Sequence, residues 1–190
     1  MDKHLVFVVH KHKATSLHYD FRLEIGGVMP SWSIPKGPTL DNTLKRLAMP
    51  TTDHELAYRH FEGVIPEGQY GAGPVMIWDE GYYIPEIEIS KGVRQEITDR
   101  KEGEKVMEEG LKKGEIKFVL NGKKLHGSFA LVKTRGWGPK DSWLLIKHND
   151  ASVEKDWNAN NFDFSAESGK SIEEIEKKLN YNKTNNSAIG

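Results

Sequence analysis

The chain has 190 residues, a formal net charge of −1 at pH 7 and no cysteine. This length favours a single domain with a core that needs no covalent cross-links. The lack of cysteine excludes disulfides and thiolate chemistry and fits a reducing cytoplasm, which we predict as the location. The near-neutral charge argues against a protein that coats nucleic acid non-specifically. The apolar run Leu5–Val9 is too short to span a membrane.

The first forty residues predict three strands. Leu5–His10 is a mostly apolar run, and Leu17–Ile25 alternates apolar and polar residues, which is the pattern of a strand with one buried face. Gly26-Gly27 predicts a hairpin turn, after which Val28–Ile34 returns as a third strand. Pro35–Pro38 then predicts a loop.

The middle of the chain carries weaker signals. Leu40–Pro50 is weakly periodic, so we predict a loop with a short helical turn there. Val75–Trp78 predicts a strand that ends at Glu80-Gly81. Glu86–Arg100 is highly charged and is predicted to be irregular.

Residues 101–147 are predicted to form one helix followed by three strands. Lys101–Lys113 has the helical period, and Gly114 is the expected C-cap. Three further strands are expected at Ile116–Leu120, Ser128–Lys133 and Trp143–Lys147. Many short strands joined by glycine turns favour a mainly β fold, a small antiparallel barrel with a few short peripheral helices.

We divide the chain into a barrel domain, residues 1–150, and a C-terminal extension, residues 151–190. Ser171 and Glu174 have the spacing of a capping box, which predicts a short helix over residues 171–179. Tyr181–Gly190 is polar and is expected to be mobile.

A row of polar side chains on the second predicted strand carries the strongest chemical signal. Side chains two residues apart on a strand share a face at a spacing of roughly 6.5–7 Å, so His18, Asp20 and Arg22 line up. His12 joins them if Lys13–Ser16 forms a turn. Two imidazoles and a carboxylate suit a catalytic divalent metal such as Mn²⁺, Fe²⁺ or Zn²⁺. The arginine suits a phosphate bound to that metal.

The competing interpretation is a solvated polar ladder, because the outer face of a strand is usually polar. The distribution of histidine favours the metal: six of the eight histidines lie within the first sixty residues. The same sixty residues hold eight Lys/Arg against six Asp/Glu. That small excess of positive charge would serve to hold a few phosphates.

A second group of candidates follows between positions 36 and 58. His54 and Tyr58 would share a face if residues 54–58 formed one helical turn. Each candidate also has an ordinary explanation: Lys36 as a turn lysine, Arg46 as surface charge, and a histidine near a tyrosine as structure. The glycines of Gly68–Gly73 suggest a phosphate loop, but no Gly-Lys-Ser/Thr follows, so we predict tight turns there.

These motifs occur together, and in this order, in one known family. The series resembles the 3′-phosphoesterase module of bacterial DNA ligase D, in its stand-alone form, over most of residues 5–148. The segments that carry the resemblance are Phe7–His12, Leu17–Glu24, Ser31–Pro38, Lys45–Ala48, Asp53-His54 with Tyr58, Phe61–Gly71, Gly122–Val132 and Trp143–His148.

The resemblance implies a β-barrel core and a DNA-repair enzyme that heals 3′ ends. Such an enzyme removes a terminal ribonucleoside and then the remaining 3′-phosphate, which leaves a 3′-hydroxyl. The resemblance implies Mn²⁺, with Co²⁺ or Zn²⁺ as alternatives, held by His12, His18 and Asp20. It assigns catalysis to Arg22, His54 and Tyr58 and phosphate binding to Arg22, Lys36, Arg46, His54 and Tyr58.

Two positions depart from the family pattern, and several roles stay open. Thr52 stands where Glu is common, and His10 where Gln is common, which offers a further imidazole near the metal. His54 could bind the phosphate or protonate the leaving oxygen. The nucleophile could be water, which we favour, or an imidazole.

The expected partners are DNA or RNA-tipped 3′ ends and a separate ligase and polymerase, with no membrane and a monomeric state. A non-catalytic DNA-end binding module that recruits those enzymes is one alternative function. A metal-dependent phosphatase of small molecules is another.

Overall fold

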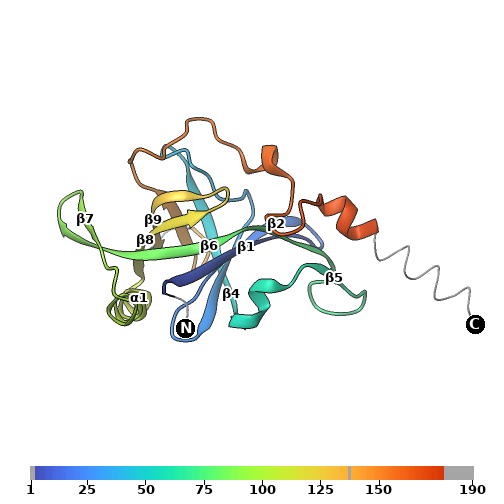
Figure 1. The fold of residues 1–190 in the computed structure, drawn as a ribbon, viewed down its shortest axis with the longest axis horizontal. Coiled ribbons are helices and arrows are strands. Elements are labelled where there is room, and N and C mark those ends of the chain that lie inside the picture. The colour runs from blue at the N-terminus through green and yellow to red at the C-terminus, as the bar shows by residue number, and fades with distance from the viewer. Residues whose placement is uncertain (1–2, 137, 178–190) are drawn as a thin grey trace, which may run out of the picture.

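The barrel closes because its first strand is paired along both edges. In the computed structural model, which describes residues 3–136 and 138–177, β1 (Leu5–Lys13) pairs with β2 (Leu17–Leu23) and with β6 (Gly73–Ser90). The order around the barrel is β1-β2-β3-β4-β10-β9-β8-β6, with antiparallel neighbours throughout. Figure 1 shows β1 beside the long strand β6. This arrangement confirms the predicted mainly β, antiparallel barrel.

The remaining elements complete or decorate this barrel. Its other strands are β3 (Val28–Ile34), β4 (Lys45–Glu55), β8 (Glu115–Gly122), β9 (His126–Lys133) and β10 (Trp143–Lys147). Two short strands pair with β6, namely β5 (Gly63–Ile65) and β7 (Val93–Glu96). The helical segments are η1 (Leu56–His60), α1 (Arg100–Lys113), η2 (Ala159–Phe162) and residues 172–177.

The prediction of a loop over Leu40–Pro50 is wrong for most of that segment, because β4 begins at Lys45. The first residues of β4 pair with β10 and the later ones with β3. Most of β4 is partly or fully exposed, so its apolar period is weak in the sequence. Pairing on both edges, which a local pattern does not show, makes this segment a strand.

The strand predicted to end at Glu80-Gly81 continues to Ser90. At Gly81 the barrel brings β8 close: a Cβ there would lie 2.1 Å from the Asn121 carbonyl oxygen. Gly81 therefore marks a close approach of two backbones and not a strand end. The first part of Glu86–Arg100, predicted to be irregular, pairs with β7 as the end of β6.

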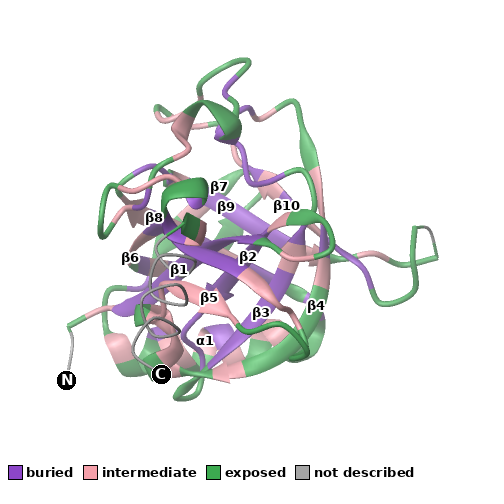
Figure 2. Ribbon diagram, turned by 90° about the vertical axis from the view of Figure 1, so that its right-hand side faces the viewer, coloured by how far each residue is buried: buried purple, intermediate pink, exposed green. Residues whose placement is uncertain are grey.

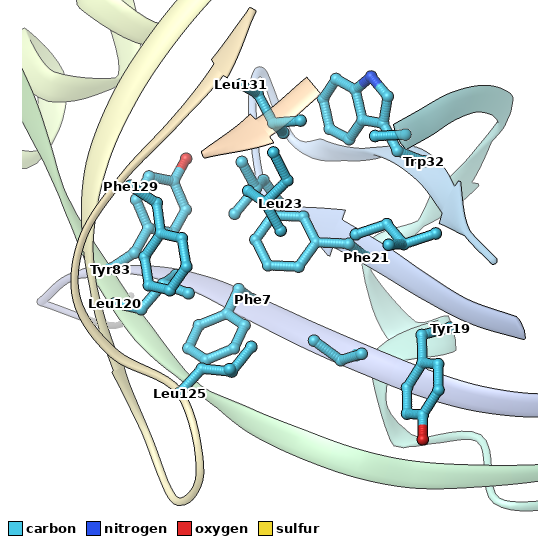
Figure 3. Close-up of a cluster of buried hydrophobic side chains, with 14 of the residues drawn as sticks. Phe7, Tyr19, Phe21, Leu23, Trp32, Tyr83, Leu120, Leu125, Phe129 and Leu131 are labelled. Carbon is cyan, nitrogen blue, oxygen red and sulfur yellow. The ribbon is translucent and has the colours of Figure 1, made fainter. Parts of the chain in front are cut away.

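Alternation along β1 and β2 separates the core from the outer face of the barrel. Phe7 and Phe21 are almost fully buried and stack at 6.2 Å between ring centroids inside the barrel (Figure 3). The buried residues run along the barrel strands, whereas the connecting loops are mostly exposed (Figure 2). The even-numbered side chains of these two strands therefore point away from this core.

The helix and C-terminal predictions are partly confirmed. α1 ends at Gly114, whose φ of 85° is the left-handed conformation that glycine adopts freely. Ser171 and Glu174 form both hydrogen bonds of a capping box. Trp157 and Ile172 belong to the same buried cluster as the barrel residues. The division at residue 150 stays a prediction, and Tyr181–Gly190 lies outside the described residues.

Candidate metal and phosphate site

The β1–β2 hairpin brings the predicted metal ligands together. The turn between the strands places His12 directly opposite His18, and Asp20 lies two pairs further along the ladder, opposite His10. One ligand atom from each of His12, His18 and Asp20 can be chosen so that all lie within 4.8 Å of one another. The predicted turn that returns His12 beside His18 is thus confirmed. We call these three residues together with Arg22 the β1–β2 cluster.

The cluster is enclosed, so the alternative of a solvated ladder does not describe it. Asp20 is 6% exposed and Arg22 is 3% exposed. The Asp20 side chain therefore does not face open solvent. Tyr58 from η1 covers Arg22, with the guanidinium carbon 5.2 Å from its ring centroid.

Backbone carbonyls fix the orientation of both imidazoles. His12 Nε2 lies 2.7 Å from the Gly71 carbonyl oxygen, and His18 Nδ1 lies 3.0 Å from that of Ser16. A carbonyl oxygen only accepts, so these two nitrogens carry the hydrogens. In the neutral rings, His12 Nδ1 and His18 Nε2 are then lone pairs, and they lie 3.7 Å and 3.4 Å from the Asp20 carboxylate oxygens.

The charges of the cluster are strongly coupled. Burial alone would raise the pKa of Asp20, but the two facing imidazoles of His12 and His18 and the charge of Arg22 outweigh it and hold that pKa well below its usual range. The facing Asp20 carboxylate raises the pKa of His18, against the effect of burial. Asp20 is therefore an ionised carboxylate at neutral pH.

Arg22 is held in place by three side chains. Its Nη2 donates to Asp20 Oδ2 at 3.1 Å, and its Nε donates to His10 Nδ1 at 3.0 Å. Its Nη1 lies 3.1 Å from His54 Nδ1. The guanidinium is thus fixed beside the carboxylate, where its charge favours an anion.

His54 and Tyr58 reach the cluster by a different route from the one predicted. His54 is the last residue but one of β4 and Tyr58 lies in the 3₁₀ helix η1, so residues 54–58 do not form one α-helical turn. Their ring centroids are nevertheless 4.6 Å apart. Burial and the nearby Arg22 lower the pKa of His54, and burial raises the pKa of Tyr58. His54 is therefore neutral at pH 7.

His54 Nδ1 has two possible partners. It lies 2.8 Å from the Thr52 carbonyl oxygen and 3.1 Å from Arg22 Nη1. It can donate to the carbonyl or accept from the guanidinium, but not both. Thr52 acts here through its backbone, which any residue at this position would supply.

Lys36 and Arg46 stay outside this set of contacts. Lys36 is exposed in the turn after β3, and Arg46 lies on β4 with its Nε buried and without a hydrogen-bond partner. Within residues 3–136 and 138–177, no hydrogen bond or ion pair joins either side chain to the β1–β2 cluster.

Two contributors were not identified as such from the sequence. His10 was expected to offer a spare imidazole to the metal, but it is fully buried and its Nδ1 accepts the Arg22 hydrogen bond. Burial, with a smaller effect of Arg22, lowers its pKa to about 3, so it stays neutral. Gly71 supplies the carbonyl that orients His12, and its positive φ of 76° was signalled only by the glycine-rich sequence around it.

The fold and the site together define a class: an eight-stranded antiparallel barrel with a buried His-His-Asp-Arg cluster on its outer face. Residues 10–133 match the DNA Ligase D 3′-phosphoesterase domain. The chain belongs to this family.

Three relatives show how far the similarity extends. The multifunctional non-homologous end joining protein LigD of Pseudomonas aeruginosa is 43% identical over 149 residues, which is 78% of this chain and 16% of the relative. The LigD of Mycobacterium tuberculosis is 37% identical over 149 residues, again 78% of this chain and 17% of the relative. That of Mycolicibacterium smegmatis is 38% identical over 144 residues, 76% of this chain and 17% of the relative. The chain thus spans about a sixth of the length of these relatives.

Proposed function

We propose that this protein is a metal-dependent enzyme that heals 3′ ends of DNA during repair by non-homologous end joining. It removes a terminal ribonucleoside and then the 3′-phosphate that remains. One observation carries the proposal: the lone pairs of His12 and His18 converge on the Asp20 carboxylate, with their N–H groups directed to backbone carbonyls. This is the arrangement of metal-ligating histidines oriented by a second shell.

The residues present fit a divalent metal with open coordination positions. Two imidazole nitrogens and one carboxylate leave places for water and substrate. His12, His18 and Asp20 would hold the ion, with Mn²⁺ as our assignment and Co²⁺ or Zn²⁺ as alternatives. When bound, such an ion polarises phosphoryl oxygens and lowers the pKa of water.

Among the described residues, no helix is long and apolar enough to cross a membrane.

Each of the two reactions replaces one phosphorus–oxygen bond by another. In the first, a water oxygen bonds to phosphorus and the bond to the 5′-oxygen of the terminal ribonucleoside breaks. That 5′-oxygen takes up a proton, so the products are a free ribonucleoside and a 3′-phosphate end. In the second, water attacks that phosphate and the bond to the 3′-oxygen breaks. The 3′-oxygen takes up a proton, so the products are a 3′-hydroxyl and inorganic phosphate. A separate ligase or polymerase could then use the end.

Arg22 is the residue best placed to stabilise the negative charge that develops on the phosphate. Its guanidinium is buried, and its position is fixed by Asp20 and His10. A donor fixed in advance stabilises a transition state without reorganising. His54 and Tyr58 lie against it and are assigned as further phosphate contacts. Lys36, in the turn after β3, and Arg46, on β4, are assigned the same role, as the family resemblance implies.

His54 could take part in the reaction in either of two ways, depending on which ring nitrogen carries the hydrogen. If its Nδ1 accepts from Arg22, its Nε2–H can donate to a phosphate oxygen or to the leaving oxygen. If its Nδ1 donates to Thr52, its Nε2 is a lone pair that could act as a nucleophile. We assign the first state and water as the nucleophile, because the Arg22 hydrogen bond keeps His54 within the site.

The decisive experiment compares three substrates with and without metal. The substrates are an oligonucleotide that ends in a 3′-ribonucleotide, the same oligonucleotide with a 3′-phosphate, and a free nucleoside monophosphate. We expect both oligonucleotides to be processed, chelator to abolish the reaction and Mn²⁺ to restore it. His18→Ala should not recover at any Mn²⁺ concentration that restores the parent.

The other outcomes separate the rival functions. Tight binding of the oligonucleotides without turnover would indicate an end-binding module. Faster hydrolysis of the nucleoside monophosphate would indicate a phosphatase of small molecules. Full activity in excess chelator would contradict the assignment of His12, His18 and Asp20 as metal ligands.

A further inference from the structure

A shallow groove lies at the other end of β1 from the hairpin that holds the metal ligands. It has a volume of about 360 Å³ and is bordered by the N-terminal segment, η1 and the β6–β8 region. Its charged lining consists of Lys3, Arg59, Lys123 and Glu80. Tyr82, which is 40% exposed and stacks on His4 at 4.7 Å, adds an aromatic surface.

The groove is positively charged in a protein whose net charge is −1. Among the residues that the structure describes, three cationic side chains line it against one carboxylate, Glu80, which pairs with Lys123 at 3.1 Å. A larger groove of about 830 Å³ beside α1 provides the contrast, because its five lysine and arginine residues face four glutamates. Among the described lining residues the excess of cations is two in the smaller groove (three against one) and one in the larger (five against four), so the smaller groove favours a polyanion more strongly.

The groove lies on the same face of β1 as the proposed catalytic site. Val6, which lines the groove, and His12 are both even-numbered residues of β1, and the pairing of β1 with β2 shows no register shift. Side chains of the same parity share one face of a strand. Six residues at ~3.3 Å each place the groove about 20 Å from His12. Between them lies η1, which presents Tyr58 to the site and Arg59 to the groove.

We propose that this groove binds the sugar–phosphate backbone of the strand whose 3′ end lies in the catalytic site. The inference rests on the proposed function for the location of that end. Cationic side chains beside an exposed aromatic ring are the usual composition of a single-strand binding groove. A strand advances by about 3.4 Å per nucleotide, so the groove would hold phosphates about six nucleotides from the end.

The length of the substrate tests the proposal directly. We expect kcat/KM for removal of a 3′-phosphate to rise from a four-nucleotide to a twelve-nucleotide oligonucleotide and then to level off. The gain should appear mainly in KM, because the distant phosphates contribute to binding and not to chemistry. A parent enzyme that treats both lengths equally would overturn the proposal.

Charge reversal in the groove should remove this gain. We expect Lys3→Glu combined with Arg59→Glu to raise KM for the twelve-nucleotide substrate about tenfold while leaving kcat/KM for the four-nucleotide substrate within about twofold, since two phosphate contacts are lost. The dependence of log KM on log salt should become shallower by about 1.4 for those two contacts. Lys113→Glu, which changes an exposed lysine of the larger groove, is the matched control and should behave as the parent.

The remaining outcomes keep the two proposals apart. Equal losses on both substrate lengths, or the same loss in Lys113→Glu, would overturn the groove. A protein that hydrolyses no oligonucleotide would contradict the proposed function alone. Fluorescence anisotropy with a labelled twelve-nucleotide strand would then still test the groove. The proposal requires the double variant to bind this strand more weakly than the parent does, with an unchanged melting temperature.

Discussion

Two largely buried polar clusters of this barrel combine the same kinds of group, but their hydrogen bonds are arranged differently. One is the β1–β2 cluster. The other, which we call the β9–β10 cluster, consists of Ser128, Lys147, His148 and Asp150. Each combines an imidazole, a carboxylate and a cation with little access to solvent.

In the β9–β10 cluster every strong acceptor faces a donor. Lys147 donates to Asp150 Oδ1 at 2.7 Å and to the carbonyl oxygens of Ser128 and His148. The Ser128 hydroxyl donates to Glu86 at 2.5 Å, so the His148 Nδ1–H donates to Ser128 Oγ at 2.7 Å. A fully paired cluster of this kind stabilises the strands that it joins.

In the β1–β2 cluster the acceptors face one another. With both rings neutral, no hydrogen lies between the nitrogens of His12 and His18 and the carboxylate of Asp20. Such an arrangement is unfavourable unless a cation or a proton is shared among them. The facing Asp20 carboxylate raises the pKa of His18, which is the direction expected where a carboxylate oxygen faces a ring nitrogen. Acceptor atoms that face one another thus distinguish a candidate metal site from a structural cluster in which each acceptor is paired with a donor.

The largest effect is expected from Asp20→Asn. The amide keeps the size of the side chain but replaces a ligand oxygen and the negative charge, so hydrolysis of a 3′-phosphate should fall at least about 10³-fold. Mn²⁺ titration followed by calorimetry should show weaker binding. Near-parental activity in saturating Mn²⁺ would contradict the metal assignment. Phe21→Ala is the matched control on the core face: it should destabilise the fold by ~3–5 kcal/mol but keep the activity of the folded fraction.

A smaller loss is expected from Arg22→Lys. Lysine keeps the charge but cannot replace the planar set of donors that contacts Asp20, His10 and His54 at once. We expect metal binding to persist, affinity for a 3′-phosphate end to change within a few-fold, and kcat to fall on the order of 10²–10³. A parental kcat would mean that Arg22 supplies only charge. The hydrogen bonds to phosphate would then have to come from Lys36, Arg46 or His54.

The sequence predicts the β1–β2 cluster well because the chemistry there follows local rules. Period-two alternation places Asp20 and Arg22 on one face, and a short turn returns His12 beside His18. These local rules do not indicate which residues from elsewhere in the chain cover that face. Tyr58 and Gly71 arrive from other parts of the chain, so the burial of Asp20 was not foreseen.

The errors in the fold have a related cause. β4 and the second half of β6 are strands because their neighbours pair with them, not because of their own apolar pattern. A glycine such as Gly81 is typical of a strand end, but here its lack of a side chain allows the backbone of β8 to come close. Local sequence reports propensity, whereas barrel closure is a property of pairs of distant segments.

Asp150→Asn asks whether the β9–β10 cluster is purely structural. Lys147 has a fully buried side chain, and without the carboxylate its ammonium loses its counter-charge. Since Asp150 is itself partly exposed, we expect a loss of about 2 kcal/mol in the free energy of unfolding, less than for a fully buried pair. Urea titration measures this loss. Activity of the folded protein should be unchanged, and a drop in kcat comparable to that of Asp20→Asn would break the distinction between the two clusters.

The smallest expected effect is a change in how stability depends on pH. Burial, then the charges of Arg94 and Lys117, lowers the pKa of His148 from 6.5 to about 4. The unfolded chain therefore takes up a proton at this residue as the pH falls through 6.5, while the folded protein does not until about pH 4. The folded state binds fewer protons in that window, so the free energy of unfolding contributed by His148 decreases as the pH is lowered.

His148→Asn should remove that contribution while keeping an N–H that can donate to Ser128. Urea titrations in the presence of chelator should give a shallower decline between pH 6.5 and pH 4 than in the parent. Comparison with the parent cancels the other histidines: His10, whose lowered pKa acts in the same direction, and His18, whose raised pKa acts in the opposite one. Identical slopes for the two proteins would mean that His148 is protonated in the folded state, and the fully paired description of the β9–β10 cluster would then be wrong.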